Sequence, residues 1–167
     1  GAVREHCNSL RACGIESLEI KYPAQISGVQ GLIIPGGEST TVGKLLVRHK
    51  MLDLLTQMGA NGFPIFGTCT GLILLAKEII GSSQPRLNLM NITVERNAFG
   101  RQIASFEEDL PIPELGPPDF HAIFIRAPYI VKAGPGVKVL IEMDGKILMA
   151  RQHNLLAAAF HPELTPD

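Results

Sequence analysis

A cysteine between two glycines is the feature of this sequence with the clearest chemical meaning. Residues 67–71 read GTCTG and follow a short apolar run that is typical of a buried strand. Paired glycines permit a sharp strand-to-helix turn, which leaves the side chain between them exposed at the end of the sheet. A helix start also favours the thiolate, the form of cysteine that attacks. The segment predicts that Cys69 is a nucleophile; the alternative is a buried structural cysteine in a glycine-rich turn.

A nucleophile needs a base and a group that orients the base, and residues 161–163 supply both types. His161, Pro162 and Glu163 directly follow the apolar run 155–160. The carboxyl ends of strands face the crevice where open α/β sheets bind ligands. Pro162 favours an extended His161, so that Glu163 can accept from one ring nitrogen while the other faces Cys69. The tripeptide alone is a weak signal, but together with the elbow it predicts a Cys-His-Glu triad.

The remaining histidines and cysteines give no further site. His6, His49, His121 and His153 are predicted to be surface or packing residues. The histidines and cysteines lack C-x-x-C and H-x-x-x-H spacing, so no metal is expected. An odd number of cysteines, 3, argues against a disulfide framework and favours a reduced, cytoplasmic protein.

A second glycine-rich turn covers residues 35–41, with sequence PGGESTT. Exposed backbone N–H groups in such a turn suit a phosphate or an oxyanion. The spacing of a P-loop is absent and Lys44 is misplaced for one. Beside a thiol nucleophile, stabilising an oxyanion is the better use of this turn. A capped turn without a ligand is the alternative.

These motifs sit between elements that the apolar periodicity predicts. Helices are expected over residues 2–13, over 40–58 with Ser39 or Thr40 as cap, and over 72–80. Strands are expected over residues 17–21, 31–34, 63–66, 91–95, 121–126, 138–142, 146–151 and 155–160, with an exposed loop over 107–119. The alternating first half predicts a parallel sheet with helices on both faces, in a single α/β domain over 1–167.

Composition limits the partners. Hydrophobic residues make up 46% and charged residues 19% of the 167 residues, and the formal net charge is −1. Without a basic tract there is no reason to expect nucleic acid or a membrane surface. The longest apolar runs fall far short of the roughly 20 residues that span a bilayer.

Together the motifs resemble the class I (triad) glutamine amidotransferases, and within them the glutaminase subunits of the pyridoxal 5′-phosphate (PLP) synthases. The matching stretches are GAVREH at residues 1–6, PGGESTT at 35–41, FGTCTGL at 66–72, VERNAFGRQ at 94–102, SFE at 105–107, FIRAP at 124–128 and FHPE at 160–163. The resemblance implies a flavodoxin-like three-layer sandwich with a mostly parallel central sheet. It also implies a single amidotransferase domain truncated at both ends, without its first strand and last helix.

The resemblance assigns roles to residues. Cys69 is then the nucleophile, His161 the acid–base and Glu163 its orienting partner, while backbone N–H groups of Gly37 and Thr70 form the oxyanion hole. Thr70 stands where the family has alanine, a mild change because only its N–H is needed. The implied glutamine-binding residues are Gly37, Glu38, Ser39, Arg96, Ile125 and Arg126.

The implied reaction is hydrolysis of L-glutamine to glutamate and ammonia through a γ-glutamyl thioester. The ammonia passes to a (β/α)8-barrel synthase that makes PLP, and this chain itself binds neither PLP nor another cofactor. The alternatives are a glutaminase subunit of another amidotransferase, a truncated non-catalytic interaction subunit, and a thiol hydrolase or chaperone-like domain with the same elbow.

Overall fold

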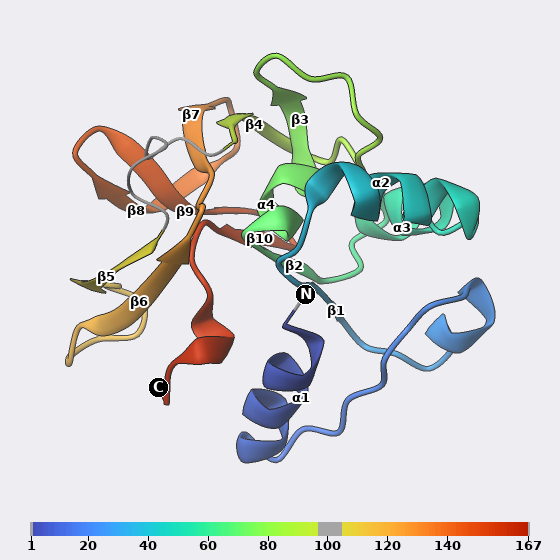
Figure 1. Ribbon diagram of the computed structural model, residues 1–167, viewed down its shortest axis with the longest axis horizontal. Coiled ribbons are helices and arrows are strands. Elements are labelled where there is room, and N and C mark those ends of the chain that lie inside the picture. The colour runs from blue at the N-terminus through green and yellow to red at the C-terminus, as the bar shows by residue number, and fades with distance from the viewer. Residues whose placement is uncertain (1, 97–104, 167) are drawn as a thin grey trace.

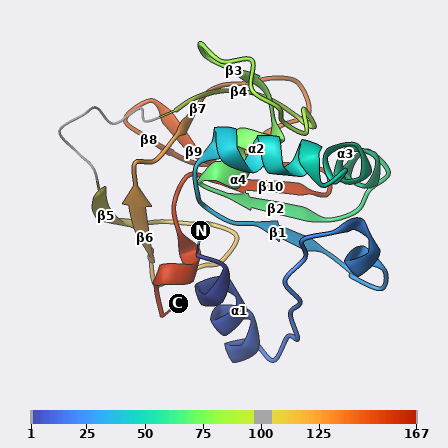
Figure 2. The same cartoon turned by 45° about the vertical axis from the view of Figure 1, so that its right-hand side comes forward.

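The computed structural model describes residues 2–96 and 105–166. A curled mixed sheet forms the centre of the molecule (Figure 1). Helices α2 (Ser39–Arg48) and α3 (Leu52–Ala60) lie on one side of its β1-β2-β10 part, and α1 (Val3–Ala12) lies on the other (Figure 2). The expected α/β fold of helices on both sides of a sheet is confirmed.

The main sheet has the order β1-β2-β10-β9-β7-β4-β3, with β8 paired to β9; β5 and β6 form a separate two-stranded sheet. The strands are β1 (Leu32–Ile34), β2 (Ile65–Thr68), β3 (Ala76–Ile79), β4 (Met90–Glu95), β5 (Ser105–Leu110), β6 (Phe120–Ile125), β7 (Tyr129–Ala133), β8 (Lys138–Met143), β9 (Lys146–Gln152) and β10 (Leu155–Ala158).

The main sheet is mixed rather than mostly parallel. Only β1 with β2, β2 with β10 and β3 with β4 pair in parallel among the described strands. Short connections in the second half cause the difference. A hairpin turn at Asp144 and Gly145 joins β8 to β9, and His153 and Asn154 join β9 to β10, so these neighbours must pair antiparallel.

The expected helix over 40–58 is two helices. The chain leaves helical geometry after α2, where Lys50 has a φ of 57°, and resumes in α3. The cap also differs from the prediction: Glu38, not Ser39 or Thr40, accepts hydrogen bonds from the first N–H groups of α2. Carboxylates at this position satisfy N–H groups that the helix leaves unpaired.

The expected helix over 72–80 ends early. Helix α4 covers Thr70–Leu75, and the following residues form β3, which pairs with β4. All six residues of α4 are buried. Residues 72–76 are all apolar and carry no periodicity, so helix and buried strand are indistinguishable there. Only Lys77 and Glu78, both exposed in β3, interrupt the apolar run.

Other expectations are also corrected. Residues 17–21 form no strand. The expected loop over 107–119 begins as part of β5, and β7 was not predicted. The expected absence of a first strand and a last helix is not borne out by any contact described and stays a prediction. The described elements bury an apolar core that includes Ile34, Ile65 and Phe160.

The turn from β2 into α4 needs glycine at both ends. A Cβ on Gly67 would overlap the backbone of Gly71, and a Cβ on Gly71 would overlap the carbonyl oxygen of Ile34 in β1. The glycines therefore let the start of α4 lie directly against β1 and β2. Backbone atoms cannot rotate away as a flexible side chain can, so this proximity tolerates no side chain.

We predict that Gly71→Ala lowers the free energy of unfolding by about 3 kcal/mol or more, the upper end for overpacked cores. Denaturant unfolding measures this. Gly31→Ala is the matched control, because its added Cβ would make only ordinary contacts at 3.7 Å with Pro64. Equal unfolding midpoints for the two variants would contradict the steric argument.

Candidate active site

Cys69 lies at the carboxyl end of β2, in a strained turn. Its φ of 49° and ψ of −100° are rare for a residue with a side chain. The backbone N–H donates to the carbonyl oxygen of Ala158 in β10 at 2.8 Å, and the residue is 7% exposed. This is the conformation expected of a nucleophile elbow, and the predicted sharp turn is present.

His161 and Glu163 lie at the same edge of the sheet. The parallel register of β2 and β10 places Ala158 opposite Thr68, so the residues after both strands leave the sheet side by side. The backbone N–H of His161 donates to the carbonyl oxygen of Ile123 in β6 at 2.8 Å. Its Nδ1 lies 2.8 Å from Oε1 of Glu163, which belongs to the short 3-10 helix η2 (Pro162–Leu164), and both residues are buried.

The charge of His161 depends on its two partners. Burial disfavours the imidazolium, but hydrogen bonds to Cys69 and Glu163, together with the charges of those groups, outweigh it and raise the pKa of His161 to about 9. A cationic His161 beside Cys69 favours a reactive thiolate.

The Pro-Gly-Gly turn packs against the His161 ring. A Cβ on Gly36 would lie 2.5 Å from Cε1 of His161, so only glycine fits there. The hydroxyl of Thr70, next to Cys69, donates to the carbonyl oxygen of Gly37 at 2.5 Å. The structure thus brings together Gly37 and Thr70, the two residues whose N–H groups were expected to hold an oxyanion.

Glu38 is occupied as the cap of α2. Its carboxylate accepts from Thr40 N at 2.9 Å, Thr41 N at 2.7 Å and Thr41 Oγ1 at 2.6 Å. The hydroxyl of Thr41, followed by the two backbone N–H groups, lowers the pKa of Glu38 to about 2. An exposed carboxylate that stays ionised can still attract a cation, but the position of Glu38 is set by its own helix.

Ser39 and Arg96 meet at Gln84, a residue that the sequence did not indicate. Oε1 of Gln84 accepts from Arg96 Nη1 at 2.8 Å, from Ser39 Oγ at 3.2 Å and from Thr40 Oγ1 at 3.2 Å. Gln84 is 7% exposed, and its Nε2 has no partner among the described residues. No local pattern marks Gln84, because its role depends on three residues from two other parts of the chain.

Ile125 is the last residue of β6, and Arg126 follows it. Sγ of Cys69 lies 3.9 Å from the carbonyl oxygen of Ile125, which places this backbone beside the thiol. Both residues are exposed, and Arg126 has a φ of 44°. Of the glutamine-binding residues expected from the sequence, Ser39 and Arg96 therefore contact Gln84, while Ile125 and Arg126 lie at the end of β6. Gly37 and Glu38 lie in the turn before α2.

His6 was expected to be a surface or packing residue, and the structure places its ring next to Thr68 and Glu163. Its Nε2 lies 3.2 Å from Oγ1 of Thr68 and 3.3 Å from Oε2 of Glu163. A helical histidine gives no sign of this in the sequence, because the contact depends on how α1 packs against η2.

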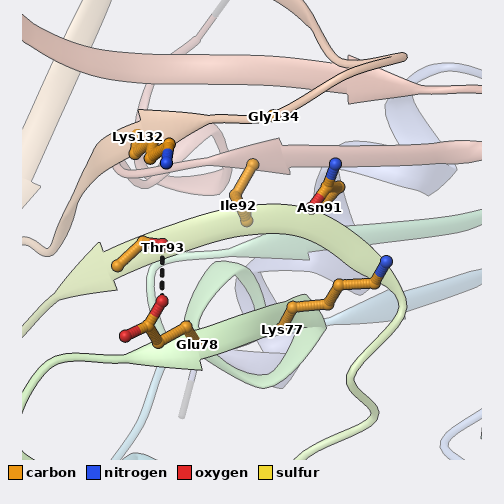
Figure 3. Close-up of a pocket in the computed structure, with 7 residues that line it drawn as sticks. All are labelled: Lys77, Glu78, Asn91, Ile92, Thr93, Lys132 and Gly134. Atoms are coloured by element: carbon orange, nitrogen blue, oxygen red, sulfur yellow. Dashed lines mark hydrogen bonds between the residues drawn. The ribbon is translucent and has the colours of Figure 1, made fainter.

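Other features of the described residues lie away from the triad. No three His, Cys, Asp or Glu side chains in residues 2–96 and 105–166 come together in a way that could hold a metal ion. A pocket over β3, β4 and β7, with Glu78, Asn91 and Lys132 among its lining residues, includes no triad residue (Figure 3). None of the described helices is long and apolar enough to cross a lipid bilayer.

Comparisons with known proteins agree on one family. Residues 1–167 match the SNO glutamine amidotransferase family. The chain is 60% identical to the PLP synthase subunit PdxT of Pelotomaculum thermopropionicum and 58% identical to that of Moorella thermoacetica. The two alignments cover 100% of this chain, and they cover 85% and 89% of the length of the respective relative.

Solved structures agree with the sequence relatives. A crystal structure of a glutamine amidotransferase superposes with a TM-score of 0.95 at 47% identity, over 100% of this chain and 88% of that one. The PurLQS structure from Thermotoga maritima, at 15% identity and a TM-score of 0.67 over 98% of this chain and 82% of that one, shares the fold. The chain belongs to the SNO glutamine amidotransferase family.

Proposed function

We propose that this chain is the glutaminase subunit of a PLP synthase and hydrolyses L-glutamine to L-glutamate and ammonia. The observation that carries the proposal is the buried His161–Glu163 pair at 2.8 Å, at the same sheet edge as the strained Cys69. The relatives named PLP synthase subunits, which match the whole chain, support the choice of partner. Residues 1–167 then act as one glutaminase domain.

The chemistry uses each member of the triad in turn. The Cys69 thiolate attacks the side-chain amide carbon of glutamine, and the oxyanion accepts from the N–H groups of Gly37 and Thr70. The His161 imidazolium gives its proton to the departing nitrogen. The C–N bond breaks, ammonia leaves, and a γ-glutamyl thioester remains on Cys69. Neutral His161 then takes a proton from a water molecule as that water attacks the thioester carbonyl. The tetrahedral intermediate breaks its C–S bond, which releases glutamate, its carboxyl proton going to solvent, and restores the Cys69 thiolate beside the His161 imidazolium. Glu163 orients His161 throughout.

Recognition of glutamine would use both groups of polar residues. An arginine holds a carboxylate bidentately, so Arg96 or Arg126 would take the α-carboxylate, and Glu38 and Ser39 would meet the α-ammonium. Gly37 and Ile125 offer backbone groups next to Thr70 and Cys69. Gln84 would set the position of Arg96.

The ammonia would pass to a (β/α)8-barrel synthase subunit, which builds PLP, and neither nucleic acid nor a membrane has a part. The free cysteines of this chain, Cys7, Cys13 and Cys69, suit a reducing, cytoplasmic setting.

We predict that Cys69→Ala lowers ammonia release from glutamine by at least about a thousandfold, because no other group can form the thioester. The assay measures ammonia with and without a barrel synthase from a relative. Cys13→Ala, which removes an exposed thiol, is the control and keeps activity. Undiminished hydrolysis by Cys69→Ala would refute the mechanism. A wild-type chain that binds the synthase without releasing ammonia would instead indicate an interaction subunit.

We predict an alkaline limb in the pH profile: kcat/KM falls as pH rises above about 9, because His161 then loses its proton.

The same group makes the free energy of unfolding depend on pH. Its pKa is raised from 6.5 to about 9 on folding, so the native state holds the extra proton between these values. The unfolding free energy should therefore fall as pH rises from about 6.5 to about 9. His161→Gln should flatten that slope; an equal slope in the variant would rule out His161 as its source.

We predict that Gln84→Leu raises the KM for glutamine about tenfold, with a smaller effect on kcat. Loss of the amide oxygen frees Arg96 and Ser39, and about tenfold corresponds to one lost hydrogen bond to a charged group. Steady-state kinetics measures it, and Gln57→Leu, on the exposed side of α3, serves as control. An unchanged KM would show that Gln84 does not order the glutamine site.

A further inference from the structure

His6 is buried, although the rest of its helix, α1, is not. Of the ten residues of α1, all of them described, only His6 is buried, at 7% exposure. Burying an imidazole costs free energy unless its ring nitrogens find partners. Its position is therefore not explained by apolar packing alone.

The partners of His6 belong to the reactive edge. Nε2 lies 3.2 Å from Oγ1 of Thr68, the residue before Cys69, and 3.3 Å from Oε2 of Glu163. The ring thus lies between the strand that carries the nucleophile and the carboxylate that orients His161.

Glu163 needs a second donor. Its side chain is 0% exposed, and Oε1 is taken by His161 Nδ1. Oε2 has no hydrogen bond from any described residue, although His6 Nε2 lies within ion-pair distance of it. A buried carboxylate oxygen without a donor is unfavourable, and a small rotation of the His6 ring would align Nε2–H with it.

The protonation of His6 fits this role. Burial lowers its pKa; Glu163 opposes that effect, His161 adds to it, and Glu5 weakly opposes it. His6 is thus neutral near neutral pH and has a single N–H. A carboxylate only accepts, so the proton must be on Nε2 for the contact with Glu163 to stabilise the pair.

We propose that His6 is a positioning residue of the triad, whose Nε2–H holds the Glu163 carboxylate and through it the His161 ring. The inference rests on the proposed glutaminase function. His6 contacts Thr68 and Glu163, not the residues proposed to bind glutamine, so it acts on the chemical step rather than on substrate binding. Its loss weakens the support that Glu163 gives to the His161 imidazolium.

The test compares His6→Leu, which removes the donor, with His6→Gln, whose amide nitrogen donates from a similar distance along the side chain. In the complex with the synthase, His6→Leu should lower kcat about tenfold with KM within about twofold. The groups that face His161 are Cys69, Glu163 and His6, and the first two raise its pKa. The alkaline limb of His6→Leu should move down by about one pH unit, because Glu163 is then no longer held against the His161 ring. His6→Gln should restore most of the limb.

The control is His49→Leu, which removes a half-buried histidine at the end of α2 and leaves the limb in place. A His6→Leu limb that coincides with the wild-type limb overturns the inference even if kcat falls, since a loosened fold alone lowers activity without moving the pKa of His161.

An independent measurement needs no variant and no activity. Nitrogen-15 NMR of the imidazole should show His6 neutral, with its proton on Nε2, near neutral pH. A proton on Nδ1 alone overturns the inference. Wild-type protein that releases no ammonia with the synthase would contradict the proposed function, and the tautomer would then decide the His6 contact by itself.

Discussion

The parallel pairing of β2 with β10 is the constraint on which the site depends. It sets Thr68 opposite Ala158 and joins Cys69 N to the Ala158 carbonyl at 2.8 Å. Although these two strands lie almost ninety residues apart in the sequence, the thiol and the imidazole that follow them lie at the same edge of the sheet. A shift of one residue in this register would send one of the two side chains to the opposite face of the sheet.

Around that pairing, a series of close polar neighbours begins and ends at the end of β2, although Oε2 of Glu163 has no hydrogen bond among the described residues. It leaves β2 at Thr68, crosses α1 through His6, reaches Glu163 in η2, and returns through His161 to Cys69, the residue after Thr68. Each step lies in a buried region, where a polar group without a partner is costly and a paired one is strongly oriented. Displacing one member removes a partner from its neighbours, which favours the arrangement of β2, α1 and η2 that the structure shows.

The sequence could indicate the chemistry better than the sheet. Cys69 and the His161–Glu163 pair could be predicted from the sequence, because paired glycines and a proline fix their local geometry. β3 was missed because the apolar run 72–76, which has no periodicity, leads directly into it. β7 was missed because its pairing partners are distant in sequence. The mixed sheet was missed because the antiparallel hairpins come from the second half of the chain, while the first half shows the parallel pattern. His6 and Gln84 depend on tertiary packing, which no local pattern encodes.

In the proposed glutamine site, glutamine rather than glutamate at position 84 leaves Arg96 its full charge. A carboxylate there would orient Arg96 but would also neutralise it, and a substrate carboxylate would then compete with an internal one. The amide oxygen of Gln84 accepts from Arg96 at 2.8 Å without contributing a charge. The same oxygen accepts from Ser39 and Thr40, at the start of α2, so one neutral atom links the arginine to the turn that borders Cys69. Arg96 is thereby held in place while its positive charge remains available for an anionic group.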